Sequence, residues 1–106
     1  MFIDGDGTGD PAWCFTIKTA DTSTAGSAHV CTTDYVVDGD WVHLVGIFDR
    51  PAGKIKLYVN GTPEIGGSYT EAAAPTVWPA TGKFAIARAW HNATPVDRWT
   101  GDLDEV

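Results

Sequence analysis

The stretch from residue 41 to residue 61 constrains the fold more than any other part of the chain. Residues 41–48 (WVHLVGIF) form a nearly continuous apolar run, which predicts a strand buried on both faces, with Trp41 in the core. Residues 49–53 (DRPAG) supply a turn, because proline presets its own φ and glycine accepts a positive φ. Residues 54–60 (KIKLYVN) alternate apolar and polar side chains. The stretch therefore predicts an antiparallel hairpin, and hence a protein built from sheets.

The alternation in residues 54–60 assigns its side chains to two faces. The positions expected to face inward are Ile55, Leu57 and Val59, and those expected to face outward are Lys54, Lys56, Tyr58 and Asn60. His43 lies within the apolar run, where a hydrogen-bonded core histidine is a better interpretation than a catalytic base. Asn60-Gly61 is typical of a tight turn.

The rest of the chain adds further short strands and no sustained helical period. Residues 13–18 (WCFTIK), 29–33 (HVCTT) and 83–90 (KFAIARAW) are predicted strands, and a last one begins at residues 103–106. Residues 20–27, 69–79 and 91–99 are expected to be loops or irregular. Short strands separated by turns predict an all-β protein with two antiparallel sheets packed as a sandwich or jelly roll.

Two cysteines, Cys14 and Cys31, lie in the strands predicted on either side of the loop at residues 20–27. Neither has a CxxC neighbour, so zinc binding and thioredoxin chemistry are disfavoured. The alternatives are two buried free thiols or one disulfide, and the disulfide is favoured because both flanks resemble strands of one hairpin. Such a bond would contribute about 3 kcal/mol by constraining the unfolded chain, and it would indicate an oxidising compartment.

The length and charge of the chain narrow the classes of partner. The 106 residues suffice for one domain, and 7 Lys and Arg against 14 Asp and Glu give a net charge of −7. A negative field repels phosphate, which disfavours nucleic acids and anionic membrane surfaces as partners. The apolar runs span only a few residues, so membrane insertion by a helix is not expected. A neutral partner, a cation or a basic surface fits this charge better.

Carboxylates gather near both ends of the chain. The segment that includes Asp4 and Asp6 begins like a calcium loop, but its twelfth position is Phe15, which excludes an EF-hand. Asp102 and Asp104 could share one face of a strand, as the paired carboxylates of some glucanases do, yet no third carboxylate follows at that alternation. An enzyme is therefore not expected. A looser calcium site using these four aspartates remains a hypothesis, beside plain acidic turns and a solvated strand edge.

Five tryptophans are many for a chain of this length. Trp78 and Trp99 lie in loop-like stretches and Trp90 ends a predicted strand, so these three are the candidates for exposure. The apolar C–H face of a sugar ring stacks well on aromatic side chains, which makes the three tryptophans candidate carbohydrate-binding residues. The alternative is that each packs under a long loop.

Three segments together resemble a known family. Residues 41–49 (WVHLVGIFD), 53–61 (GKIKLYVNG) and 101–106 (GDLDEV) are similar, in order and spacing, to the signature of concanavalin A-like LamG domains of secreted bacterial proteins. The resemblance implies a two-sheet antiparallel jelly roll that belongs to a larger extracellular protein. Family members bind carbohydrates, partner proteins or calcium, or serve as structural spacers. The resemblance thus favours a non-catalytic extracellular module that binds carbohydrate, with a structural or assembly module as the alternative.

The resemblance also implies that residues 1–106 form a single domain without the family's usual first and last strands. A sandwich lacking those strands would expose sheet edges and apolar surface. It could bury them against another protein chain or against a second copy of itself. A homo-oligomer is therefore expected more than for a full-length member of the family.

Overall fold

The computed structural model describes residues 2–5, 11–20, 22, 24–32, 39–61, 68–77, 79, 81–82, 84–91, 94–96 and 98–106. These residues form strands, turns and loops and include no helix, so none of them forms a helix that could cross a membrane. The strands are β1 (Phe2–Gly5), β2 (Pro11–Lys18), β3 (Ser27–Cys31), β4 (Leu44–Asp49), β5 (Lys54–Val59), β6 (Ser68–Ala73), β7 (Ala89–His91) and β8 (Thr94–Val96).

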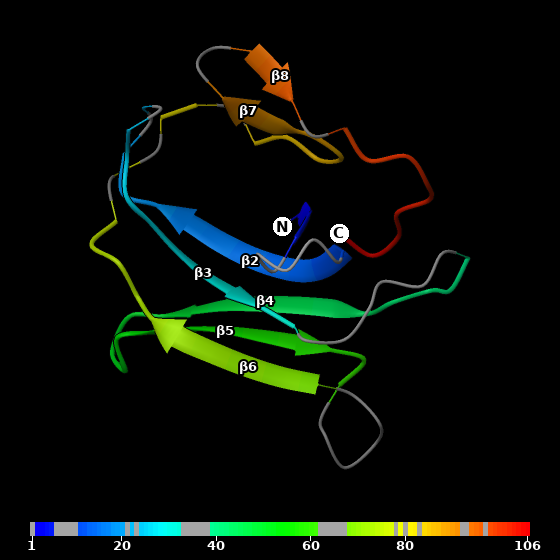
Figure 1. Cartoon of the computed structure of the whole chain (residues 1–106), viewed down its shortest axis with the longest axis horizontal. Helices are drawn as coiled ribbons and strands as arrows, with labels where there is room; N and C mark the ends of the chain where they lie inside the picture. Colours follow the sequence, from blue (N-terminus) through cyan, green and yellow to red (C-terminus); the bar gives the residue numbers. More distant parts are fainter. Residues whose placement is uncertain are drawn as a thin grey trace.

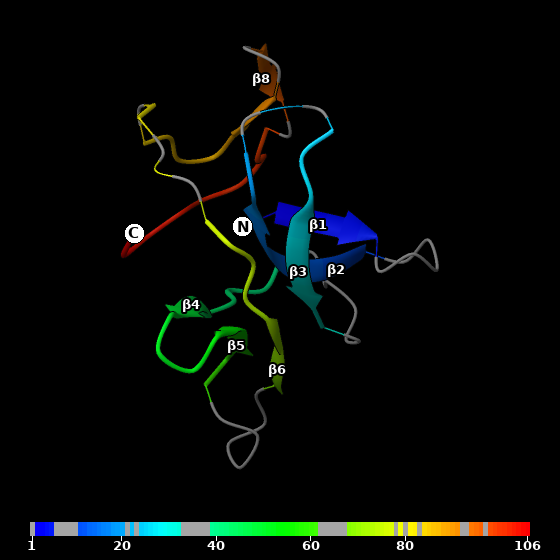
Figure 2. The same cartoon turned by 90° about the vertical axis from the view of Figure 1, so that its left-hand side faces the viewer.

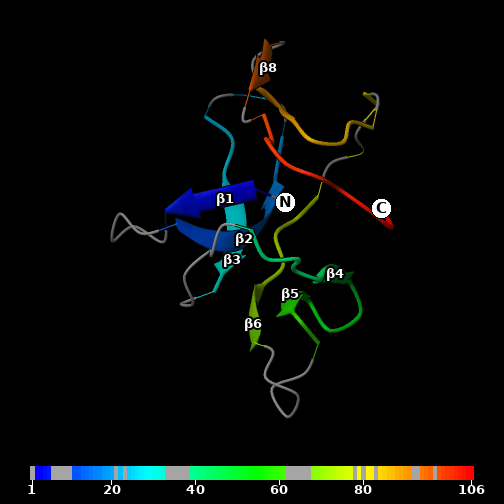
Figure 3. The same cartoon turned by 90° about the vertical axis from the view of Figure 1, so that its right-hand side faces the viewer.

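Two three-stranded antiparallel sheets make up the body of the molecule. One has the order β1-β2-β3 and the other the order β4-β5-β6 (Figure 1). A small ribbon of β7 and β8 lies at the end of the molecule opposite the β4–β6 sheet (Figure 2). Figure 3 shows the two sheets and the ribbon from the opposite side. The prediction of an all-β antiparallel sandwich is confirmed.

The core lies between the two large sheets. Its most buried members on β5 are Ile55 and Leu57, both 0% exposed, and the alternation of that strand places them on the same face as Val59. Trp13 of β2 and Val30 of β3 pack against them from the other sheet. The predicted inward face of residues 54–60 is therefore confirmed, and the burial of these apolar side chains is the main source of stability.

One glycine allows the two sheets to approach closely. Gly46 of β4 lies under the ring of Phe15 from β2, and a Cβ at this position would lie 2.9 Å from the ring. Real Cβ atoms do not come so close to another heavy atom, so any side chain at position 46 would displace the ring. Gly46 thus sets the spacing at which the second sheet packs on the first.

The turn between β4 and β5 forms as the sequence predicts. The backbone N–H of Ala52 donates to Oδ1 of Asp49 over 3.1 Å, and the backbone N–H of Gly53 donates to the carbonyl of Arg50 over 3.1 Å. Gly53 has a φ of +62°, in the left-handed region that glycine tolerates best. The turn fixes the register of the hairpin, in which Asp49 lies opposite Lys54.

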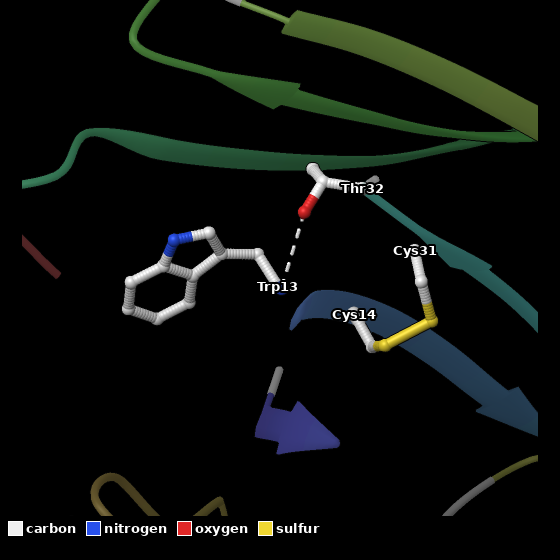
Figure 4. The surroundings of a disulfide bond; sticks show 4 residues. All are labelled: Trp13, Cys14, Cys31 and Thr32. Atoms are coloured by element: carbon white, nitrogen blue, oxygen red, sulfur yellow. Dashed lines mark hydrogen bonds between the residues drawn. A yellow bond between two sulfur atoms is a disulfide. The ribbon is translucent and has the colours of Figure 1, made fainter. Parts of the chain in front are cut away.

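The predicted disulfide is confirmed. Cys14 of β2 and Cys31 of β3 lie directly opposite each other, with Cα atoms 4.2 Å apart, and their side chains are bonded (Figure 4). Beside the bond, the backbone N–H of Trp13 donates to Oγ1 of Thr32 over 3.3 Å. The Thr32 backbone N–H donates in return to the carbonyl of Trp13 over 3.0 Å. These contacts hold β2 to the end of β3 where Trp13 enters the core.

Three expectations about residues 41–48 are wrong. Trp41 precedes β4 and is 71% exposed instead of lying in the core. His43 is also exposed, and its backbone N–H and carbonyl form hydrogen bonds with Asn60. Ile47 is 38% exposed, so β4 is not buried on both faces. The physical reason is that the opposing sheet covers one face of β4 only.

Several strand boundaries also differ from the sequence-based expectation. Residues 69–79 were expected to be irregular, yet β6 occupies the first part of them, because pairing with β5 overrides the weak strand propensity of SYTEAA. Of the described residues 84–90, only Ala89 and Trp90 lie in a strand, β7, and β8 forms inside the expected loop at 91–99. Residues 103–106 form no strand.

Candidate functional site

The β4–β6 sheet has a second face, directed away from the core, which we call the outer face. It follows from the alternation of the three strands and from their register, which places their outward side chains in three rows. The rows are Val45, Tyr58 and Tyr69; Ile47, Lys56 and Glu71; and Asp49, Lys54 and Ala73. Aromatic, charged and aliphatic groups therefore lie together on one face of the sheet.

The first row contains an aromatic pair. Tyr58 of β5 lies directly opposite Tyr69 of β6, with ring centroids 4.8 Å apart and ring planes inclined by 42°. Tyr69 is 39% exposed and Tyr58 is half-buried. Such pairing of opposite aromatic side chains stabilises neighbouring strands and holds the rings in place. The pair forms a pre-ordered aromatic surface that a ligand could contact.

Two ion pairs join the charged side chains in a diagonal pattern. Nζ of Lys54 lies 2.8 Å from Oε1 of Glu71, and Nζ of Lys56 lies 2.8 Å from Oδ2 of Asp49. In the strand register, however, Lys54 is opposite Asp49, and Lys56 is opposite Glu71. Each lysine therefore forms an ion pair with one carboxylate and lies directly opposite a second carboxylate on a neighbouring strand.

The aromatic pair is linked to this network. The hydroxyl of Tyr69 donates a hydrogen bond to Oε2 of Glu71. The other carboxylate oxygen of Glu71, Oε1, accepts a hydrogen bond from Nζ of Lys54. The bond to Glu71 is the main cause that raises the pKa of Tyr69, because the carboxylate stabilises the protonated phenol. The hydrogen bond from Lys54, followed by that from Tyr69, lowers the pKa of Glu71 below its ordinary value.

The second ion pair, between Lys56 and Asp49, also shifts the pKa of each of its two side chains. The hydrogen bond from Lys56 is the main cause that lowers the pKa of Asp49, and the backbone N–H of Ala52 adds to it. The bond to Asp49 in turn raises the pKa of Lys56. The lowered pKa values keep Asp49 and Glu71 ionised at neutral pH, and together with the two lysines the formal charges of these four side chains sum to zero.

The predicted tryptophan site is only partly described. Trp99 is half-buried, packs against the core and lies with its ring centroid 6.0 Å from that of Trp13, which agrees with the alternative that it packs against the interior. Its indole N–H is buried and has no hydrogen-bond partner in the described part of the chain. Trp90 lies on β7 with a side chain outside the described structure, and Trp78 lies outside the described residues.

The predicted calcium site is likewise only partly described. The backbone of Asp4 lies in β1, but its side chain and the whole of Asp6 are outside the described structure. Asp102 and Asp104 are exposed on a segment without regular structure. Among the described residues, no group of three or more His, Cys, Asp or Glu side chains gathers as a metal site would require. These four aspartates remain a prediction.

A family model described as the Concanavalin A-like lectin/glucanases superfamily, of the laminin G type, matches residues 2–106. The chain belongs to this family. Neither a curated protein nor a solved structure gives a significant match to this laminin G-like domain. Domains of the family are commonly non-catalytic binding modules and are typically extracellular, and the Cys14–Cys31 disulfide is consistent with such a location.

Sequence reasoning alone did not single out the outer face of this laminin G-like domain as a site. It did place Lys54, Lys56 and Tyr58 on the outward side of their strand. It missed Tyr69 and Glu71, because their segment was expected to be irregular. The signal that could have found them is the alternation of SYTEAA, which puts both residues on one face once the segment is taken as a strand.

Proposed function

We propose that this laminin G-like domain is a non-catalytic carbohydrate-binding module and that the outer face contacts the sugar. The observation that carries this proposal is the solvent-accessible Tyr58–Tyr69 pair, held beside a network of hydrogen-bonding side chains on the same face of the sheet. Ring faces offer an apolar surface to the C–H face of a sugar, and the neighbouring donors and acceptors match its hydroxyl groups.

The pre-ordering of the site supports the same proposal. Tyr69 is held by its hydroxyl bond to Glu71 and by the ring of Tyr58, so binding would immobilise few new rotamers. The side chains come from strands and not from loops, which fixes their spacing within the sheet. Both features lower the entropic cost of binding.

The test is binding of the whole chain to a panel of glycans, followed by substitution of the aromatic pair. Tyr69→Ala should weaken binding about ten-fold or more, because one exposed ring of the platform is lost. Phe84→Ala is the matched control, since it also removes an exposed ring but lies outside the outer face. Equal affinities of Tyr69→Ala and the unmodified chain would refute this site. No binding to any glycan by folded protein would refute the function.

The same experiment tests the tryptophan and calcium predictions. If Trp78→Ala, Trp90→Ala or Trp99→Ala loses binding while Tyr69→Ala retains it, the sugar-binding site would be assigned to the tryptophans instead of the outer face. Binding through the outer face should survive a chelator, because its groups are an aromatic pair and two ion pairs. Binding abolished by the chelator would instead favour a calcium-dependent site at the four aspartates.

We further propose that the domain is secreted or displayed at a bacterial cell surface.

An assembly module is a second proposal, favoured by a different observation. Phe84 is 85% exposed, Trp41 is 71% exposed and Ile86 is 50% exposed. Large apolar side chains so exposed are typical of surfaces that contact another protein chain or a second copy. Sedimentation at increasing protein concentration would reveal self-association, and a monomer at all concentrations would restrict this proposal to a different partner chain.

A further inference from the structure

The four charged side chains of the outer face form a closed arrangement. Asp49 forms an ion pair with Lys56, and Glu71 forms one with Lys54. In the strand register, Lys56 also lies opposite Glu71, and Lys54 lies opposite Asp49. Positive and negative groups therefore alternate at every step. Both ion pairs are partly accessible to solvent, so a ligand on this face would meet them.

Arg50, in the turn between β4 and β5, is directed to the other side of the sheet. The guanidinium of Arg50 lies over the ring of Phe48, 5.8 Å from its centroid, and Phe48 packs against the core. Arg50 therefore adds no positive charge to the three rows of the outer face. The described outer face has two cations and two anions, on a chain whose net charge is −7.

From this arrangement we infer that Asp49 and Glu71 are specificity-determining residues that restrict the outer face to neutral sugars. This inference rests on the proposed function, because it specifies the class of carbohydrate bound at that site. Lysines beside tyrosines would otherwise attract sulfated or carboxylated glycans. Here each lysine already has a carboxylate within bonding distance, so an acidic sugar would have to displace it and remain beside it.

Neutral sugars meet no such obstacle. A hydroxyl group can donate to a carboxylate oxygen of Asp49 or Glu71 and can accept from the ammonium group of a lysine. Neither contact requires an ion pair to separate, because carboxylate oxygens accept more than one hydrogen bond. The network thus attracts hydroxyl groups and repels anions with the same residues.

The test compares two probes, heparin as a sulfated glycan and oligogalacturonate as a carboxylated one, on the unmodified chain and on charge variants. The unmodified chain should bind neither at physiological salt. The double variant Asp49→Asn/Glu71→Gln should gain about ten-fold or more in affinity for heparin, because both lysines then lack an anionic partner. The gain should fall as salt is added.

Each single variant should gain much less than the double variant. In Asp49→Asn the ammonium of Lys56 still faces Glu71, and in Glu71→Gln that of Lys54 still faces Asp49. The matched control is Asp102→Asn/Asp104→Asn, which changes the net charge of the chain by the same amount on an exposed segment that contributes no side chain to the three rows. If the control gains as much as the double variant, net charge alone explains the effect and the inference is wrong.

Two other outcomes would overturn the inference. One is heparin binding by the unmodified chain that is lost in Lys56→Gln, and the other is a folded double variant with no gain. Circular dichroism and thermal unfolding establish folding, and the single variants replace the double variant if it does not fold. Failure of the proposed function is a separate result: the neutral glycans then fail to bind the unmodified chain, whatever heparin does with the variants.

Discussion

The two faces of β5 share one backbone and differ in everything that their side chains do. Ile55 and Leu57 point inward and are inaccessible to solvent, whereas Lys56 and Tyr58 point outward into the charged and aromatic rows. The difference shows that the two-residue period of a strand separates stability from recognition. Substitution of an inward residue should change the free energy of unfolding, and substitution of an outward residue should change binding.

The largest expected effect comes from breaking the inner face. Leu57→Ala should lower the free energy of unfolding by about 2–5 kcal/mol, because it removes buried methyl groups and leaves a cavity between the sheets. Urea unfolding followed by circular dichroism would measure this change. The neighbouring Lys56→Ala is the control and should have a much smaller effect, since it removes only a solvent-accessible ion pair. Comparable losses in both variants would contradict the division between the faces.

The spacing of the two sheets provides a second, smaller test. Gly46→Ala should lower the free energy of unfolding by about 1–3 kcal/mol, because the new Cβ would collide with the ring of Phe15. Gly82→Ala is the matched control, since a Cβ there meets no atom within 4 Å. A Gly46→Ala variant as stable as its control would mean that the sheets do not pack closely at this point.

The inner face was largely predictable from the sequence because its signal is local. The alternation KIKLYVN defines the inward residues, the DRPAG turn defines the hairpin, and the disulfide joins two segments that each resemble a strand. For the strand and the turn, the residues that carry the signal lie within a few positions of one another, and the two cysteines, 17 residues apart, lie in neighbouring strands of one hairpin. Local pattern and final structure therefore agree.

The exposure of Trp41 and the composition of the outer face could not be predicted from local sequence patterns, because both depend on how strands distant in sequence pair with one another. Trp41 precedes β4, whose pairing with β5 ends where Leu44 lies opposite Val59, and His43 is hydrogen-bonded to Asn60 just beyond that pair. Hydrophobicity alone does not show where the partner strand ends. Likewise, Tyr69 joins Tyr58 only through the β5–β6 register, which composition does not specify for a segment of small and polar residues.

The smallest expected effect is a dependence of stability on pH that arises from the outer face. The pKa values of Asp49 and Glu71 are lowered in the folded state, mainly by hydrogen bonds from Lys56 and Lys54 respectively. The unfolded state therefore binds more protons in acid, so their contribution to stability is present above the unfolded pKa values, near about 4. It is lost as the pH falls through the lower folded values.

Urea unfolding at pH 6 and pH 3 would measure this contribution in the unmodified chain and in Asp49→Asn/Glu71→Gln. Other carboxylates also titrate in this range, but they are common to both proteins and their effect cancels in the difference. The unmodified chain should lose more stability on acidification than the double variant. Equal losses would show that the diagonal ion pairs do not persist in solution, and the alternating charges of the outer face could not then exclude acidic sugars.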